Sequence, residues 1–188
     1  MKMNFIKKYG SNVFFGCFII LLMIPQIRMP IQVFLQRTIS LSPSEILKED
    51  RNVLKSYTWN LIDTSSKILN LNQSKGNVIL INYWATWCPP CIAEMPALQQ
   101  LYDLYGTQVD FYFVTNDDPK RVSNFLKKEN YKLPVYFQAE KSPAILESNS
   151  LPTTFLFSKE GEIVMKKTGA ARWNTSKVHH TIDKLLIE

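Results

Sequence analysis

Two of the three cysteines in this 188-residue chain, Cys88 and Cys91, are separated only by Pro89 and Pro90. A thiol pair at this spacing can exchange electrons with another disulfide, bind a metal ion or close a small loop. The pair follows a continuous apolar run at residues 78–81, which is typical of a strand buried on both faces. Apolar residues then recur at intervals of three or four, which predicts a helix that begins near the first cysteine.

The predicted helix start favours redox chemistry at this pair. A sulfur in the first turn lies close to free backbone N–H groups and to the positive end of the helix dipole, and both stabilise a thiolate. Pro89 and Pro90 suit this turn, because it needs no N–H from them and their φ angle is already helical. We expect Cys88 to be the more exposed, attacking sulfur and Cys91 to resolve the mixed disulfide.

A metal site and a structural disulfide explain the pair less well. Zinc needs four ligands, and His179 and His180 are the histidines that could join the two thiolates. Adjacent histidines point about 100° apart on a helix, so we interpret both as part of a solvated helix face. A bridge across so short a loop constrains the unfolded chain little, so stability alone is a weak reason for it. We expect no metal and no cofactor at this site.

Strand and helix patterns alternate along the C-terminal part of the chain. We predict, in order, a hairpin at 59–69, strands at 78–81 and 109–115, a helix after each of these strands, a hairpin at 153–165 and a last helix capped by Asn174. This order predicts an α/β domain with a mixed central sheet, an N-terminal hairpin and helices on both faces of the sheet.

The basic excess of the chain belongs to its N-terminal segment. The formal net charge is +6, but all 16 acidic residues follow Arg37, and five of the 22 basic residues lie at or before it. The remainder is close to neutral, whereas a nucleic-acid-binding domain carries its positive charge on a folded face. We therefore expect no nucleic-acid partner.

The N-terminal charges flank an apolar segment. Lys2, Lys7 and Lys8 precede an apolar run at residues 13–24, and extension to residues 9–27 gives enough length to cross a bilayer core of roughly 30 Å. No small-residue cleavage site follows closely, so we favour an uncleaved single-pass anchor over a cleaved signal peptide. The lysines before the segment place the C-terminal part outside the cytoplasm.

These features divide the chain into three parts. We predict a cytoplasmic tip and transmembrane helix (or signal peptide) at 1–35, a polar tether at 36–56 and one folded domain at 57–188. The tether would hold the folded domain away from the membrane surface.

The region from residue 57 to residue 186 resembles the thioredoxin-like family, and more closely its membrane-tethered TlpA/ResA-like branch of thiol–disulfide oxidoreductases. Trp84 and Trp87 precede the cysteines as they do in that family. The sequence Ala-Glu-Met-Pro at 93–96 is similar to the usual continuation of that branch, and its proline matches one that kinks the active-site helix. The resemblance therefore implies a thioredoxin fold with a redox-active Cys88–Cys91 disulfide.

The resemblance also implies how a partner docks. Leu151-Pro152 resembles a loop whose proline is cis and faces the cysteine pair, and the backbone beside it binds the partner as an added strand. Gly169 matches a glycine that closes the far side of the groove. The residues expected at the docking surface are Trp87, Pro89, Pro90, Leu151 and Pro152.

The chain departs from that family at the proton acceptor. Other thioredoxins have a buried aspartate where this chain has Asn82, and an amide cannot take the proton that the resolving thiol loses. Glu94, one turn beyond Cys91, is the nearest carboxylate in sequence. We interpret Glu94 first as a solvated helix residue and second as a proton relay, so the acceptor is left unassigned.

We predict a thiol–disulfide oxidoreductase that exchanges the Cys88–Cys91 pair with disulfide-bearing or dithiol proteins outside the cytoplasm. Pro90 occupies the position where strong oxidants often carry histidine, which favours a reductant or isomerase over an oxidant. The resemblance adds apocytochrome c maturation as one task, with electrons supplied by a membrane donor. It also implies a bacterial-type cytoplasmic membrane, with the folded domain on the periplasmic side.

Two other functions fit such a chain. A thiol peroxidase of the same fold usually carries P-x-x-x-T-x-x-C, whereas Thr86 stands two residues before Cys88. A tethered binding module could use the same groove without disulfide exchange, and it would tolerate Cys88→Ser. The cysteine context favours the oxidoreductase over both.

Overall fold

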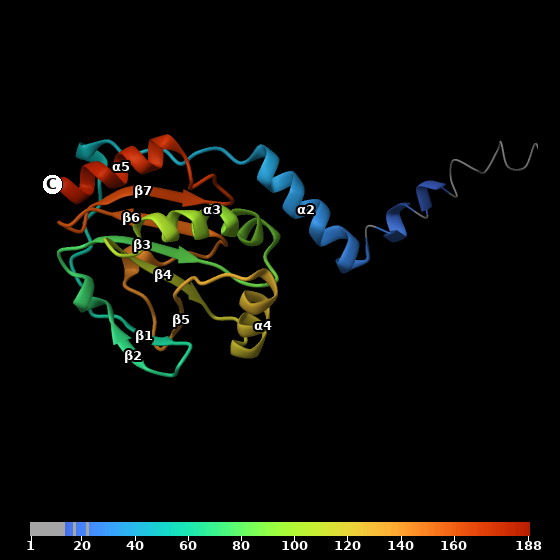
Figure 1. Ribbon diagram of the computed structural model, residues 1–188, viewed down its shortest axis with the longest axis horizontal. Helices are drawn as coiled ribbons and strands as arrows, with labels where there is room; N and C mark the ends of the chain where they lie inside the picture. The colour runs from blue at the N-terminus through green and yellow to red at the C-terminus, as the bar shows by residue number, and fades with distance from the viewer. Residues whose placement is uncertain (1–13, 17, 22) are drawn as a thin grey trace, which may run out of the picture.

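The computed structural model describes residues 14–16, 18–21 and 23–188 (Figure 1). Its labelled α-helices are α2 (Pro25–Ile39), α3 (Pro89–Tyr105), α4 (Pro119–Glu129) and α5 (Ser176–Ile187), and a further helix spans Phe14–Leu21. Its strands are β1 (Asn60–Asp63), β2 (Ile68–Asn70), β3 (Val78–Tyr83), β4 (Val109–Thr115), β5 (Val135–Gln138), β6 (Thr153–Phe157) and β7 (Ile163–Thr168). Its 3₁₀ turns are η1 (Lys48–Asp50), η2 (Leu71–Ser74) and η3 (Ala144–Leu146).

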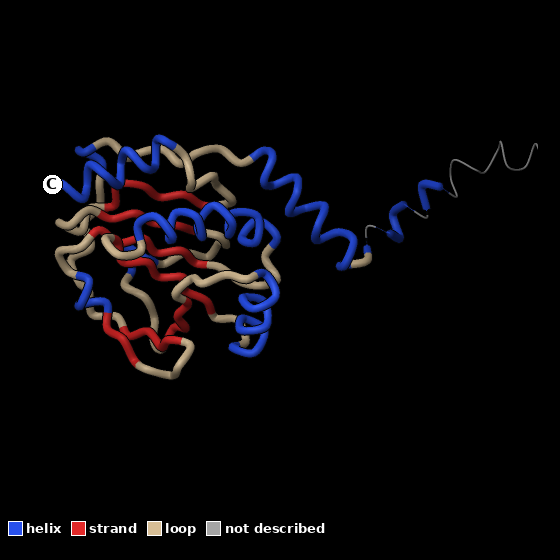
Figure 2. Tube along the Cα trace, in the orientation of Figure 1, coloured by secondary structure: helices blue, strands red, loops and turns tan. Residues whose placement is uncertain are grey.

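The strands of the described part form one mixed sheet in the order β2-β1-β5-β4-β3-β6-β7 (Figure 2). Strands β3, β4 and β5 are parallel neighbours, whereas the hairpins β1–β2 and β6–β7 are antiparallel and pair with β5 and β3. Both predicted hairpins and both predicted central strands are confirmed. The completely buried strand β3 lies near the middle of the sheet, as its unbroken apolar sequence indicates.

The two faces of the sheet are covered differently. On β3, Leu80 joins a core cluster that includes residues of α3, α4 and α5, whereas Ile79 and Ile81 join a second cluster on the opposite face. That second cluster is closed by η2, η3 and the segment before β1, through Leu71, Leu146 and Trp59 among others. The expectation of α-helices on both faces is therefore wrong.

The order of the strands explains this arrangement. The chain passes through β3, α3, β4, α4 and β5, and each step moves to the next strand in the same direction across the sheet. Because parallel crossovers are right-handed, two steps in one direction place both helices on the same face. The direction of these steps cannot be read from local patterns along the sequence.

Strand β5 is an element that the sequence patterns did not predict. It has only four residues, follows Pro134 and pairs with both β4 and β1. It therefore joins the N-terminal hairpin to the parallel part of the sheet. A run this short carries too little periodicity to be distinguished from a loop.

Helix α2 crosses the predicted boundary between anchor and tether, and its C-terminal end contacts α3 (Figure 1). The Arg37 Nε donates a hydrogen bond to the Ala93 carbonyl oxygen at 3.3 Å. Further along, Glu45 forms an isolated β-bridge with Met165 of β7. Part of the segment 36–56 thus lies against the edge of the sheet and joins α2 to the folded domain.

No single helix in the part of the chain that the structure describes is long and apolar enough to cross a membrane. Two helices, Phe14–Leu21 and Pro25–Ile39, reach that length and composition together, with a bend of 82° between them. Residues 1–13 of the predicted cytoplasmic tip lie outside the described residues. The single membrane helix stays a prediction.

Candidate active site

Helix α3 begins at the first cysteine, as the sequence predicted. Strand β3 ends at Tyr83, the loop 84–87 follows, and Cys88 takes the N-cap position with an extended backbone. The Cys88 carbonyl oxygen accepts the N–H of Ile92 at 3.1 Å. The N–H of Cys91 donates to the Cys88 Sγ at 3.3 Å. The sulfur of Cys88 therefore acts as the side-chain cap of the helix.

The two sulfurs are bonded to each other at the surface of the main core cluster. A disulfide joins Cys88 and Cys91, whose Cα atoms lie 5.2 Å apart. Cys88 is 4% exposed and Cys91 is 0% exposed, so the leading cysteine is the more accessible of the two. Both side chains belong to the core cluster that α3 forms with the sheet.

The two prolines limit how many backbone N–H groups face the leading sulfur. Pro89 and Pro90 occupy the first two helical positions, and neither has an N–H. The first N–H that the helix offers is that of Cys91, and it is the one that points at Cys88 Sγ. A thiolate at Cys88 would thus receive one backbone hydrogen bond together with the field of the helix. Both prolines also line a groove along α2.

Of the residues predicted to dock a partner, Trp87 is exposed and Leu151 is half-buried. Trp87 is 61% exposed beside the buried pair. The peptide bond between Leu151 and Pro152 is cis, as the resemblance implied, and Leu151 packs against the core cluster that contains both cysteines. Gly169 donates its N–H to the Pro152 carbonyl oxygen at 2.9 Å with a φ of +83°, a conformation that favours glycine.

Glu94 is buried, so its interpretation as a solvated helix residue is wrong. Its exposed fraction is 2%. The Asn82 Nδ2 donates to Glu94 Oε1 at 2.7 Å, and the Ala171 N–H donates to Oε2 at 3.2 Å. The Asn82 amide also donates to Thr154 Oγ1 at 2.7 Å. The carboxyl group is thereby held by Asn82 of β3, whose amide is itself bonded to β6, and by the segment after β7.

The surroundings of Glu94 change its acidity. Burial raises the pKa of Glu94 to about 8, although the hydrogen bonds from Asn82 and Ala171 oppose this shift. Glu94 follows Cys91 by three positions on α3, and residues at this spacing are neighbours on a helix, with Cβ atoms roughly 5–6 Å apart. A carboxyl that titrates near the pKa of a thiol, about 8.5, can exchange a proton with it at little free-energy cost.

Asp117 holds the loop before the cysteines, although sequence patterns indicated only a helix start there. Its carboxylate accepts the Thr86 N–H at 3.0 Å and the Thr86 hydroxyl, and its own N–H donates to Thr115 Oγ1 at 3.1 Å. Partial burial raises the pKa of Asp117, but the hydrogen bonds from Thr86 outweigh it and leave the pKa below its ordinary value. No local pattern could reveal partners 31 positions apart.

The histidines lie apart from this chemistry. The His179 Nε2 lies 2.6 Å from Asn174 Oδ1 near the start of α5. Within residues 14–16, 18–21 and 23–188, no group of three or more His, Cys, Asp or Glu side chains could hold a metal ion.

The fold and the bonded cysteine pair define the class of protein. A family model described as Redoxin matches residues 50–185, and the chain belongs to this family. Its thioredoxin-like fold is similar to a solved structure from Chlorobium tepidum, a putative thiol:disulfide interchange protein DsbE. The TM-score is 0.58 and the identity 21%, with 78% of this chain and 99% of that chain covered.

Two relatives are thiol-disulfide oxidoreductases named ResA. The protein from Bacillus cereus is 36% identical over 112 residues, which cover 57% of this chain and 64% of the relative. The protein from Bacillus subtilis is 34% identical over 114 residues, which cover 58% of this chain and 63% of the relative. The chain thus spans less than two thirds of the length of these two relatives.

The raised pKa of Glu94 predicts a stability that depends on pH. Folding raises this pKa from about 4.5 to about 8, so the folded state binds the proton more tightly than the unfolded state does. The contribution of protonated Glu94 to the free energy of unfolding is therefore complete below pH 4.5, and it is lost as the pH rises toward 8. Relative to Glu94→Gln, which cannot ionise, we expect the unmodified protein to lose up to about 1.4 kcal/mol per pH unit in this window.

Urea unfolding of the oxidised proteins at several pH values measures this difference. The matched control is Glu129→Gln, which removes a carboxylate at the exposed end of α4 and should follow the unmodified protein. Parallel stability curves for the unmodified protein and Glu94→Gln between pH 4.5 and 8 would contradict the assignment.

Proposed function

We propose that the chain is a thiol–disulfide oxidoreductase that exchanges its Cys88–Cys91 disulfide with disulfide or dithiol groups of extracytoplasmic proteins. The observation that carries this proposal is the position of the pair, bonded at the start of α3 with the Cys91 N–H on the Cys88 sulfur. A helix start stabilises a thiolate, and a thiolate is the nucleophile of disulfide exchange. Membership of the Redoxin family and the similarity to proteins named ResA support the same activity.

In the reducing direction, the Cys88 thiolate attacks a disulfide of the partner. A bond forms between Cys88 and one partner sulfur, the partner disulfide breaks, and its second sulfur leaves as a thiolate. Cys91 then loses its proton and attacks the Cys88 sulfur, which breaks the mixed disulfide and releases the first partner sulfur. Two electrons pass to the partner, and the Cys88–Cys91 disulfide is the oxidised product.

Glu94 is the residue that we assign as proton acceptor for Cys91. It is buried with Cys91, follows it by one helical turn, and its pKa of about 8 lies close to that of an ordinary thiol. Asn82 cannot accept this proton, but its amide fixes the orientation of the carboxyl group. The assignment gives Asn82 a positioning role, acting through Glu94.

The partner would dock across Trp87 and the Leu151–Pro152 loop. The exposed indole offers an apolar contact surface, and an extended partner backbone can pair beside the loop as an added strand. Gly169 fixes the loop from the other side through its bond to Pro152. Pro89 and Pro90 complete this surface next to the leading sulfur.

The two prolines favour a low reduction potential for the cysteine pair, which suits a protein that reduces its partners. A pair becomes more oxidising as its thiolate is more strongly stabilised, because the reduced form is then favoured. At Cys88 the prolines leave a single backbone N–H for the sulfur, and Pro90 provides no charged or hydrogen-bonding side chain. Reduction of a partner disulfide, including one in an apocytochrome c, is the direction we propose.

The N-terminal segment would anchor the folded domain, and with it the cysteine pair, to a membrane. The helices Phe14–Leu21 and Pro25–Ile39 together have the length and composition of a span, and basic residues precede them. We infer an anchor at 1–35, a tether at 36–56 and a folded domain at 57–188 on the periplasmic side of a bacterial-type cytoplasmic membrane. A membrane donor would then return electrons to the Cys88–Cys91 disulfide.

Trapping of the mixed disulfide tests the proposed function. Cys91→Ser removes the resolving thiol, so we expect covalent adducts between Cys88 and partner proteins to accumulate in cells that express the full chain. Cys88→Ser is the matched control and should trap none, because it lacks the attacking sulfur. Non-reducing electrophoresis followed by mass spectrometry detects the adducts. The same pattern of adducts in both variants, or no adducts in either, would contradict the proposal.

Substitutions of Pro90 test the proposed direction of electron flow. Pro90→Ala restores a backbone N–H near the Cys88 sulfur and Pro90→His adds an imidazole as well, so both should stabilise the thiolate. One net hydrogen bond, about 0.5–1.5 kcal/mol, corresponds to an increase of about 10–30 mV in reduction potential. We expect potentials to rise in the order unmodified, Pro90→Ala, Pro90→His. Equilibration with glutathione buffers measures them, and an unchanged or lowered potential would contradict this account.

A further inference from the structure

A groove of about 670 Å³ lies between α2 and the start of α3. One wall consists of Trp87, Pro89 and Pro90, which also belong to the proposed docking surface. The other wall is one side of α2, because its lining residues recur at helical spacing from Pro25 to Ile39. The docking surface thus continues without a break onto a helix that precedes the Redoxin match in the sequence.

Helix α2 is fixed to the folded domain at its C-terminal end, which lies close to α3 (Figure 1). Just beyond this end, the Arg172 N–H donates to the Leu41 carbonyl oxygen at 3.1 Å, and the Ser42 Oγ lies 2.8 Å from Thr175 Oγ1. Residues 9–27 alone are long enough for a membrane span, which leaves the rest of α2 outside the hydrocarbon core. The helix can therefore serve as a fixed wall beside the cysteine pair.

Apolar side chains on both walls of the groove are open to solvent. Trp87 is 61% exposed, Leu35 is 52% exposed and Ile39 is 65% exposed. Covering them with apolar side chains of a partner removes this surface from water, which is favourable. Gln32 and Gln36 lie on the same side of α2, and their amides can bond the N–H and C=O groups of an extended backbone. This mixture suits a polypeptide, because acyl chains would leave the amides unpaired.

The charge of the groove indicates which polypeptide fits. Among the described residues that line it, Arg28 carries the only charge, and α2 contains no acidic residue. A carboxylate of the partner therefore complements the groove, and a cationic residue does not. The side of α2 from Arg28 to Ile39 is roughly 16 Å long at 1.5 Å per residue, which about five residues of an extended chain cover.

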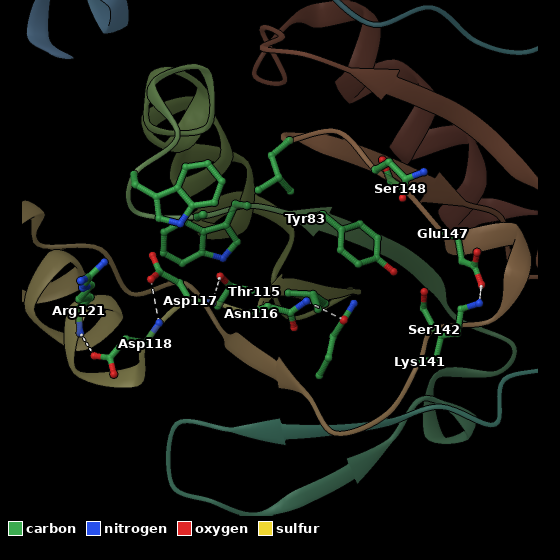
Figure 3. Close-up of a pocket in the computed structure, with 17 residues that line it drawn as sticks. Tyr83, Thr115, Asn116, Asp117, Asp118, Arg121, Lys141, Ser142, Glu147 and Ser148 are labelled. Atoms are coloured by element: carbon green, nitrogen blue, oxygen red, sulfur yellow. Dashed lines mark hydrogen bonds and ion pairs between the residues drawn. The ribbon is translucent and has the colours of Figure 1, made fainter. Parts of the chain in front are cut away.

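A second cavity, of about 660 Å³, shares Trp87 with the groove but differs in its charges. The Glu147 carboxylate lies 2.8 Å from the Lys141 Nζ, and Asp118 accepts the Arg121 backbone N–H at 3.0 Å (Figure 3). These carboxylates thus have partners within the chain. The described residues that line the groove, in contrast, supply no carboxylate to the cation on α2.

We propose that α2 and the active-site prolines together bind the partner segment next to its reacting cysteine, and that this segment is apolar and carries an acidic residue. Its apolar side chains pack on Trp87, Leu35 and Ile39, and its carboxylate pairs with Arg28. Helix α2 is then a specificity element as well as the connection to the anchor. The inference rests on the proposed function, because the partner cysteine must first reach Cys88.

The test uses the reduced full chain in nanodiscs and six-residue peptides with one terminal cysteine, capped by glutathione as a mixed disulfide. The middle residues are Leu or Ser, and the residue farthest from the cysteine is Glu, Gln or Lys. Stopped-flow tryptophan fluorescence gives the second-order rate constant for each peptide, divided by that of the same protein with glutathione disulfide. With the cysteine at one of the two ends, we expect the Leu–Glu peptide to react about 5-fold faster than Ser–Glu and about 3-fold faster than Leu–Gln.

Two neighbouring residues of α2 assign the apolar preference to the groove. Leu35→Gln alters a half-exposed side chain of the groove wall, so the variant should fold, and its preference for Leu over Ser peptides should fall to less than 2-fold. The matched control is Phe34→Gln, which changes a 70% exposed side chain outside the groove lining and should keep the preference.

Two arginine variants assign the acidic preference. Arg28→Gln should make the rates of the Leu–Glu and Leu–Gln peptides equal, because it removes the charge of the groove. Arg172→Gln removes one exposed positive charge outside the groove lining and should keep the preference, so a general effect of net charge is controlled.

The outcomes separate this inference from the proposed function. Equal rates for all peptides with the cysteine at either end, or faster reaction of the Ser or Lys peptides, would overturn the groove while exchange with glutathione disulfide continues. Equal losses in Leu35→Gln and Phe34→Gln would indicate that lipid covers α2 and would also overturn it. Failure to react with glutathione disulfide and with every peptide would overturn the proposed function, and the groove with it.

Discussion

A backbone hydrogen bond from the Cys91 N–H to the Cys88 sulfur connects the chemistry of this chain to its fold. It forms because the buried strand β3 ends just before the cysteines and α3 begins at the first of them. Two prolines at the first helical positions fix the helical φ angle but remove their own N–H groups, so this donor is the first that the helix offers. The end of the strand, the start of the helix and the choice of proline together set how strongly the leading sulfur can hold a negative charge.

Two polar groups near this sulfur, the carboxyl groups of Glu94 and Asp117, make hydrogen bonds with segments far apart in the chain. Behind it, Glu94 is buried on α3 and held by Asn82 from β3 and by the Ala171 N–H after β7. Beside it, Asp117 holds the loop before the cysteines from the end of β4. Both contacts occur near the carboxyl ends of parallel strands, where loops from neighbouring strands meet and where open α/β sheets bind their ligands. The fold thus places a buried carboxyl group and a loop anchored by Asp117 next to the cysteine pair.

Local sequence patterns predicted the parts of this arrangement that local physics determines. The apolar runs of β3 and β4 and the two prolines before Cys91 identified the central strands and the helix start, because burial and φ are properties of short segments. The burial of Glu94 could not be predicted in this way, since it depends on Asn82 and Ala171, twelve and 77 positions away. The side of the sheet that α4 covers depends on strand order, which no single segment encodes. The cis peptide bond before Pro152 was predicted from the resemblance to the thioredoxin-like family, because no periodic pattern in the sequence indicates a cis bond.

The acidity of the leading sulfur is the property on which this account depends most directly. It can be measured in the reduced full chain from the pH dependence of alkylation at Cys88, followed peptide by peptide with mass spectrometry so that other cysteines do not contribute. A free cysteine titrates at about 8.5, and the helix start should lower this value. We expect an inflection for Cys88 below about 8.5, whereas an inflection at or above that value would show that the helix start does not stabilise the thiolate.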